Sequence, residues 1–310
     1  MAKIDAYSGP ETLDVSRGKP RSSARLSRKV TMVNLAMPSI VLMLLVNAYP
    51  LGFAFIQSFH NGGLLKLGKF IGLRNYVNVL TDPAFWSAAS FTLLFTVCGV
   101  FGSWLVGFAL AIALKPHFPG RNLFKVLLLL PWIVPIVVTS MSWNWLVATP
   151  GSLLPSLAQS LGFGQVMFLA DPTMAMVTVC LFKIWISYPF MMMMGAAALE
   201  SIDPSVYEAA TLDGATPRQQ LRYIILPMTA KSTYISWILM TMFSVNDFAT
   251  IYLLTGGGPV NATTSLIVLA YRSVFQDFLP GYGVAISFMM TIVLVTLSIL
   301  LFRQVRRSNI

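Results

Sequence analysis

Two charged side chains lie inside long apolar stretches of this 310-residue chain. Lys183 falls within the stretch 173–199, and Asp247, next to Asn246, falls within the stretch 226–254. Charges in such surroundings are costly and are functional candidates by default. In one interpretation Lys183 and Asp247 neutralise each other in a structural salt bridge. In the other, these residues and Asn246 line a cavity and hydrogen-bond a bound molecule. The sequence leaves both interpretations open.

The composition predicts a membrane protein. Hydrophobic residues make up 56% of the chain and charged residues only 10%, although the formal net charge is +10. A soluble domain has about 25% charged residues, so this chain cannot cover a globular surface with polar groups. Nucleic-acid binding is not expected, because it needs Lys and Arg clustered on a soluble folded face. The two cysteines and two histidines predict neither a disulfide framework nor a metal site.

Six apolar stretches are long enough to cross the hydrocarbon core of a bilayer, which takes roughly 20 residues of helix. Helices are expected because unpaired backbone groups are not tolerated in lipid. Pro131, Pro135 and Pro189 are expected to kink or unwind the helices that contain them. The predicted fold is an all-α membrane protein with six transmembrane helices, at about 30–59, 85–114, 123–147, 173–199, 226–254 and 282–302.

The distribution of Lys and Arg predicts that both termini are cytoplasmic. With the N-terminus inside, sixteen of the 21 basic residues fall in the tail 1–29, two inner loops and the C-terminal segment. Cytoplasmic segments carry such an excess. The basic tail is interpreted as a topogenic segment that touches anionic lipid headgroups, and 30–310 as one membrane domain. Four basic residues fall in outer loops: Lys66, Lys69, Arg74 and Arg272.

The polar segment 199–231, between the fourth and fifth predicted spans, carries strong helix signals. Asp203 followed by Pro204 predicts a helix start. Asp is a good N-cap, and the N–H that proline lacks would have no partner within the helix at the first position. Gly214 predicts the left-handed residue that ends this helix. Thr216, with a glutamine three residues later, forms a capping-box pattern. The segment therefore predicts two short helices joined by a tight turn.

A helix pair held between two spans could dock in a groove of a partner and pass the partner's movement to both spans. A loop that merely reconnects the two spans is the alternative interpretation. A DNA-binding helix-turn-helix is disfavoured, because the unit is short, tethered to the membrane and acidic on its first helix. The expected docking face is apolar and small and comprises Val206, Tyr207, Ala209 and Ala210.

The run EAATLDGA, Glu208 to Ala215, followed by IILP up to Pro227, resembles the EAA motif of ABC importer permeases. These are the membrane subunits of importers that use an external binding protein. More narrowly, the chain is similar to the carbohydrate-uptake group that includes the maltose and glycerol-3-phosphate permeases. The resemblance extends over nearly all of the chain from Pro38 onward and is supported by Phe70–Leu73 with Asn75–Tyr76, Leu130–Pro131 with Trp143, Ile184–Trp185 with Pro189–Phe190, and Thr255–Pro259.

The TGGGP stretch, Thr255–Pro259, is typical of the F-like subunit of this group, so the resemblance implies one half of a heterodimer. It also implies a multi-pass protein of the cell inner membrane that works with a second permease subunit, an ABC ATPase dimer and an extracytoplasmic solute-binding protein. The maltose protein itself has extra N-terminal spans and a large outer domain, which are not predicted here, so its substrate is not carried over.

The resemblance also assigns roles to residues. It implies that the loop 200–225 contains the coupling helix, seated in a cleft of the ATPase. The ATPase-coupling residues would be Glu208, Ala209, Ala210, Asp213, Gly214 and Ala215. A sugar substrate stacks on aromatic faces, although most membrane tryptophans anchor or pack instead. The candidate substrate pathway comprises Lys183, Asn246, Asp247, Trp143, Trp185 and Tyr188.

Other functional classes fit the sequence less well. A secondary, ion-coupled transporter of small solutes usually shows intramembrane acids and more spans, often in repeated halves, and Asp247 alone supports it weakly. A membrane enzyme would need paired carboxylates, a Ser–His arrangement or a histidine cluster, none of which the sequence offers. The glycines 256–258 lack the Lys and Ser or Thr of a phosphate-binding loop. ATP and Mg²⁺ are therefore expected in the partner ATPase, with no cofactor in this chain.

Overall fold

The computed structural model describes residues 22–64 and 66–307, and every regular element in these ranges is a helix. The prediction of an all-α protein is confirmed. The chain divides after Phe53 into two compact units, and the first described element, α1 (Ser22–Gln57), supplies the described part of the first unit and continues into the second. Most of the predicted tail 1–29 lies outside the described residues.

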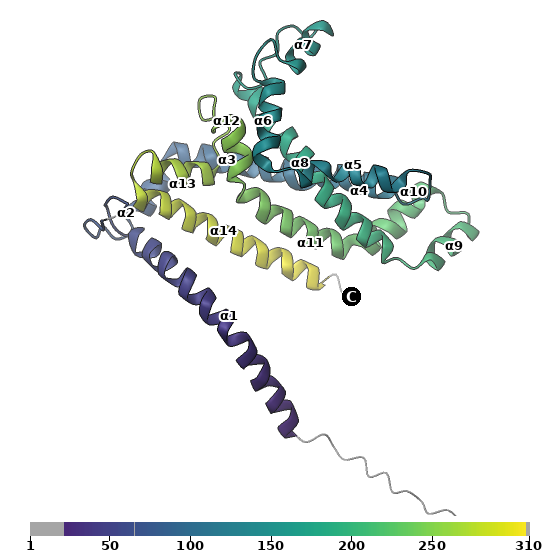
Figure 1. Ribbon diagram of the computed structural model, residues 1–310, viewed down its shortest axis with the longest axis horizontal. Helices are drawn as coiled ribbons and strands as arrows, with labels where there is room; N and C mark the ends of the chain where they lie inside the picture. Colours follow the sequence, from purple (N-terminus) through teal and green to yellow (C-terminus); the bar gives the residue numbers. More distant parts are fainter. Residues whose placement is uncertain (1–21, 65, 308–310) are drawn as a thin grey trace, which may run out of the picture. The chain divides into compact units, whose positions relative to one another are not determined.

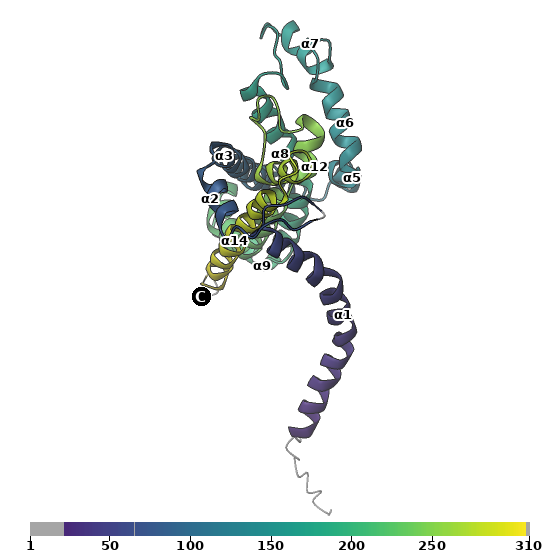
Figure 2. The same ribbon diagram turned by 90° about the vertical axis from the view of Figure 1, so that its left-hand side faces the viewer.

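The second unit is a helical bundle. Figure 1 shows α9 and α10 at one end of this bundle and α2 and α13 toward the other, and Figure 2 shows α6 and α7 projecting from it. A π-helical turn, η1, joins α3 to α4, and a second one, η2, joins α10 to α11. The elements are α2 (Arg74–Thr81), α3 (Pro83–Val97), η1 (Cys98–Gly102), α4 (Ser103–Ala113), α5 (Arg121–Ile133), α6 (Ile136–Val147), α7 (Leu153–Ser160), α8 (Pro172–Glu200), α9 (Pro204–Leu212), α10 (Pro217–Gln220), η2 (Leu221–Ile225), α11 (Leu226–Val245), α12 (Phe248–Thr255), α13 (Leu266–Phe275) and α14 (Pro280–Arg307).

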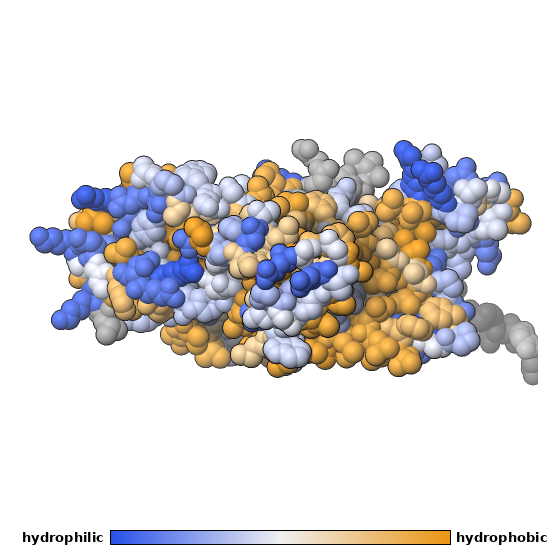
Figure 3. Space-filling view, turned by 90° about the horizontal axis from the view of Figure 1, so that it is seen from above, coloured by the Kyte–Doolittle hydropathy of each residue, from blue (hydrophilic) through white to orange (hydrophobic). Residues whose placement is uncertain are grey.

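Four of the predicted spans are continuous apolar helices: Val30–Gln57, Pro83–Ala113, Pro172–Glu200 and Pro280–Leu300. The other two predicted spans are each split into a pair of helices. Six crossings are reached only if each pair crosses the membrane as one span, so the number six stays a prediction. On the face shown in Figure 3, hydrophobic side chains cover broad areas, and strongly hydrophilic ones lie mostly at the left and upper right of the view, with a smaller group near its centre.

The stretch 123–147 was expected to be one kinked span, but it consists of α5 and α6, which meet at an angle of 92°. Val134, between the two helices, is extended, with φ −69° and ψ 133°. Pro135 accounts for this, because a proline ring clashes with a helical conformation of the preceding residue. Pro131 lies inside α5 and Pro189 inside α8, so neither proline unwinds its helix, and a kink at these two positions stays a prediction.

Small residues bring α4 and α8 into close contact. A Cβ atom at Gly107 would lie 2.6 Å from the amide nitrogen of Met192 and 2.6 Å from the carbonyl oxygen of Tyr188. A Cβ atom at Gly195 would lie 3.1 Å from Cδ2 of Phe108. Helices inside a membrane associate through such small residues, because lipid supplies no hydrophobic driving force between them. The position of α8, which carries several candidate site residues, therefore depends on Gly107.

We expect Gly107→Leu to destabilise the protein by about 1–3 kcal/mol, the usual cost of an overpacked core. The new side chain would meet the backbone of α8, which cannot rotate aside as a side chain can. The measurement is the thermal unfolding of the purified protein in detergent. Gly52→Leu, in α1, is the matched control, since a Cβ atom there meets nothing within 4 Å. Equal unfolding temperatures for the two variants would contradict the close packing.

Candidate functional site

The two helix breaks lie together and border one cavity of about 600 Å³. The first break separates α5 from α6, and the second separates α11 from α12, which meet at 45°. α8 supplies a third wall. Irregular backbone at membrane depth is tolerated where it is buried in protein or lines a cavity. The polar and proline residues of this lining are Pro135, Lys183, Ser187, Asn246, Asp247 and Thr250.

Lys183 and Asp247 form a buried ion pair across the cavity wall. The Nζ atom of Lys183 lies 2.7 Å from Oδ2 of Asp247, and the two side chains are 5% and 13% exposed. The salt bridge that the sequence left as one of two interpretations is therefore present. Both residues also line the cavity, so the pair and the cavity are parts of one arrangement. A role in binding a substrate stays a prediction.

Asp247 also holds the start of α12. Its carboxylate accepts hydrogen bonds from the backbone N–H of Thr250 at 3.0 Å and from the Thr250 hydroxyl at 2.8 Å. It is thus the N-cap of α12, where the positive end of the helix dipole favours a negative charge. The carboxylate is held by a cation, a hydroxyl and a helix terminus together.

The surroundings of Lys183 keep its long side chain in one place. Its Nζ atom lies 5.5 Å from the centre of the Phe95 ring, within the range of a cation–π contact. Gly99, in the π-helical turn η1, leaves room for the aliphatic part of the side chain. A Cβ atom at this position would lie 3.1 Å from Cγ of Lys183 and 2.8 Å from the hydroxyl oxygen of Ser244.

The predicted aromatic residues border a second cavity of about 390 Å³ on another side of α8. Trp143, in α6, lies 5.5 Å from Trp185, measured between ring centres, and both line this cavity with Tyr188. Val134, at the break between α5 and α6, lines both cavities. All six predicted pathway residues therefore lie around this break, whereas Trp145 is 78% exposed and lines neither cavity.

Ser187 is a candidate that sequence reasoning missed. It is buried in the wall of the larger cavity, and its hydroxyl oxygen has no hydrogen-bond partner among the described residues. A buried hydroxyl without a partner is costly. The sequence feature that could have identified Ser187 is its position four residues after Lys183, because this spacing places both side chains on one face of α8. Thr250 was likewise missed. It lies three residues after Asp247, which is the spacing at which an N-cap side chain accepts a hydrogen bond from a backbone N–H.

The loop between α8 and α11 forms the two capped helices that the sequence predicts. Asp203 accepts a hydrogen bond of 2.9 Å from the backbone N–H of Ser205, and this bond lowers the pKa of its carboxyl group. Gly214 has a φ of +74° and ends α9 in the left-handed conformation. Thr216 and Gln219 form the capping box at the start of α10. These local predictions are confirmed.

Burial divides the face of α9 that was expected to dock. Ala210 is buried and Tyr207 is half-buried, and the Nζ atom of Lys115 lies 3.1 Å from the centre of the Tyr207 ring. Tyr207 packs against the buried cluster that contains Phe108 and Ala111, and a docking role for this face stays a prediction. Leu212, 89% exposed, is a large apolar residue that sequence reasoning missed. The exposed residues of the motif are Glu208, Ala209, Thr211, Leu212, Asp213 and Gly214.

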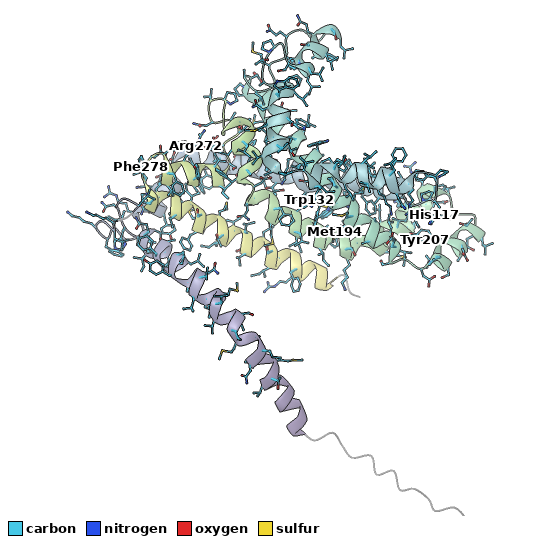
Figure 4. The ribbon with its side chains drawn as sticks, in the orientation of Figure 1. His117, Trp132, Met194, Tyr207, Arg272 and Phe278 are labelled. Carbon is cyan, nitrogen blue, oxygen red and sulfur yellow. The ribbon has the colours of Figure 1, made fainter. Side chains whose placement is uncertain are left out.

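Arg272 organises the loop that contains the TGGGP stretch. Its Nη1 donates a hydrogen bond of 2.7 Å to Oδ1 of Asn261, and its Nη2 donates another to the carbonyl oxygen of Gly256. Thr264 adds a bond of 2.9 Å to the carbonyl oxygen of Gly257. Figure 4 places Arg272 near α13, away from the end that holds Tyr207. The loop is thus a fixed surface feature of the bundle.

We expect Lys183→Met to destabilise the protein by about 3–5 kcal/mol, because it leaves the Asp247 carboxylate buried without a counter-charge. The double variant with Asp247→Asn removes both charges and should recover much of this loss. Thermal unfolding in detergent measures both effects, and Lys231→Met, at an exposed position, is the control for loss of a positive charge. A double variant no more stable than Lys183→Met would contradict the ion pair as the cause.

Comparison with known proteins identifies relatives over most of the chain. A probable ABC transporter permease protein, y4oQ, of Sinorhizobium fredii is 33% identical over 96% of this chain and 99% of its own. The trehalose/maltose transport system permease protein MalF of Thermococcus litoralis is 33% identical over 77% of this chain and 80% of its own. The sulfoquinovosyl glycerol transport system permease protein SmoG of Agrobacterium fabrum is 29% identical over 92% of this chain and 93% of its own.

The fold also matches a solved structure. A chain of a bacterial ABC transporter involved in the import of the acidic polysaccharide alginate superposes with a TM-score of 0.81 at 20% identity, over 93% of this chain and 99% of that one. This likeness bears on the fold alone. Residues 103–309 match the model of the binding-protein-dependent transport system inner membrane component, and the chain therefore belongs to this family of ABC importer permeases.

Proposed function

We propose that this permease carries a carbohydrate, as one half of a translocation pathway formed with a second permease subunit. The observation that carries the proposal is the pair of cavities at the two helix breaks. Among apolar residues, the first lining presents charged, amide and hydroxyl groups, and the second presents indole and phenol rings. Carbohydrates present hydroxyl groups that suit the first lining and C–H faces that suit the second. Relatives named for trehalose/maltose and sulfoquinovosyl glycerol transport support this class of substrate.

Individual residues of the two cavities would divide the work of binding. The amide of Asn246 and the unpartnered hydroxyl of Ser187 would hydrogen-bond sugar hydroxyl groups. Trp143 and Trp185 would stack on the sugar ring. The Lys183–Asp247 pair is fully engaged in the structure, so it would keep the breaks in position and present its polar edge to the substrate.

The exposed side of α9 would dock in a cleft of the ATPase subunit, with Glu208, Ala209, Leu212 and Asp213 in contact. Gly214 and Ala215 would form the turn, and Ala210 would keep α9 on the bundle. The loop begins at the end of α8, which carries Lys183, and leads into the continuous helix Pro217–Val245, which ends next to Asp247. Movement of α9 would therefore reach both partners of the ion pair.

The energy would come from ATP with Mg²⁺ bound in the partner ATPase. The chain would lie in the cell inner membrane with both termini and the α9–α10 loop in the cytoplasm, as the distribution of Lys and Arg favours. The loop fixed by Arg272 would then lie on the outer side, where an extracytoplasmic binding protein would deliver the substrate.

Reconstitution tests the proposal. Proteoliposomes that contain this chain, the second permease and the ATPase are tested with a panel of radiolabelled carbohydrates that includes maltose and trehalose. We expect uptake only when ATP is present on the side of the membrane that carries the ATPase and the binding protein is present on the opposite side. Proteoliposomes with this chain alone should take up none in response to a proton or sodium gradient. Gradient-driven uptake by the chain alone would support an ion-coupled secondary transporter instead and would overturn the proposal.

We expect Leu212→Asp to weaken co-purification with the ATPase by about 30-fold, the effect of losing an interface residue that contributes about 2 kcal/mol. A charge at this position would have to be desolvated in the apolar part of the cleft. Titration of the purified ATPase against the detergent-solubilised permeases measures the change. Leu161→Asp is the matched control, because Leu161 is 73% exposed but lies after α7, far along the chain from the loop. Equal affinity of the two variants would contradict docking through Leu212.

A further inference from the structure

A third cavity, of about 490 Å³, lies where three apolar helices end. α4 ends at Ala113, α8 ends at Glu200, and α5 begins at Arg121. Ends of apolar helices mark the level at which a membrane passes from hydrocarbon to headgroups. The cavity lies at the same end of the bundle as α9, and the predicted spans would place it at the membrane–water boundary. Figure 4 shows His117, one of its lining residues, at that end together with Tyr207.

Three cations line this cavity with little compensation. Lys115, Arg121 and Lys125 face one carboxylate, that of Glu200, and none of them forms an ion pair with it in the part of the chain that the structure describes. Arg121 uses Nε to donate a hydrogen bond of 2.6 Å to the carbonyl oxygen of Leu114, which leaves both amino groups of its guanidinium for another acceptor. The cavity therefore carries an excess of positive charge.

The backbone adds to this positive potential. α5 has 13 residues and begins at the cavity with Arg121, and its N-cap, Gly120, supplies no side-chain acceptor for the first amides. Free amides and the helix dipole make such an N-terminus favourable for a phosphate. Together with the uncompensated cations and the cavity, the helix start forms a site for a phosphate group.

Apart from His117, the rest of the lining is apolar and lies mainly along α4 and α8. It includes Ala111, Leu114, Met192 and Ala196, and the side chain of Leu129 from α5 closes it. A free phosphate or a nucleotide has no acyl chain that could pack against this apolar wall. A phospholipid would use both parts, with its phosphate on the cations and an acyl chain along the helices. Basic pockets between transmembrane helices bind anionic headgroups in this way.

We propose that this cavity binds one anionic phospholipid, such as phosphatidylglycerol. A zwitterionic lipid would place an ammonium group beside the excess of positive charge and bind less well. A lipid bound in this cavity would also affect the position of α9, because Lys115 of the lining contacts the Tyr207 ring of that helix. The site depends on the membrane placement of the bundle and not on which substrate the permease carries.

Native mass spectrometry tests the site on the purified complex that contains the full chain. It measures the binding of two probes, phosphatidylglycerol and phosphatidylcholine. Lys125→Ala should weaken phosphatidylglycerol binding about fivefold, since a basic residue near a headgroup contributes about 1 kcal/mol. Lys125 has no hydrogen-bond or ion-pair partner among the described residues, so its loss should not disturb folding. Lys231→Ala, an exposed lysine outside the cavity, is the matched control and should bind as the unaltered protein does.

A second variant separates a lipid from a free anion. Ala197, an exposed residue of the apolar wall, can be changed to phenylalanine without a change of charge. Ala197→Phe should weaken phosphatidylglycerol binding, because the ring takes the space of the acyl chain. Inorganic phosphate at equal concentration should not compete with the lipid. Equal binding of the two lipids, full competition by phosphate, or equal effects of Lys125→Ala and Lys231→Ala would each overturn the proposal.

Discussion

The interior of this permease depends on the need of a buried cation for a counter-charge. Lys183 lies in the middle of α8, almost completely excluded from solvent, where an unpaired ammonium group would be very costly. Asp247, which follows the end of α11, meets that need. The same carboxylate then caps α12 through Thr250. The ion pair, the start of α12 and the lining of the cavity thus share one carboxylate.

Close packing of the helices determines where Lys183 and Asp247 lie. Gly107 allows α4 to approach the backbone of α8, and Gly99 leaves room for the Lys183 side chain. α8 and α11 are also the two helices joined by the α9–α10 loop, which Ala210 and Tyr207 seat on the end of the bundle. A movement imposed on this loop therefore has a direct covalent path to both charged residues. In the proposed function, this connection would give the loop a physical route to the candidate pathway.

Local sequence signals predicted the helices well and their continuity less well. The caps at Asp203 and Thr216 and the left-handed Gly214 were predictable because each depends on residues within a few positions. The right-angle turn at Val134 was underestimated as a kink, and Pro189, expected to kink or unwind its helix, does not unwind it. Whether a proline bends or breaks a helix depends on the neighbours that satisfy the freed backbone groups, and a local pattern does not specify those neighbours.

The sequence by itself determined the class of fold, the apolar stretches, the capped loop and the set of polar residues that had to be accommodated in the membrane, because these follow from composition and short-range geometry. Only the tertiary structure decided which of them meet. It paired Lys183 with a residue 64 positions away, turned Ala210 inward and Leu212 outward, and gathered Lys115, Arg121 and Lys125 around one cavity. Such choices depend on how helices pack against each other, and that packing is set by contacts between residues far apart in the chain.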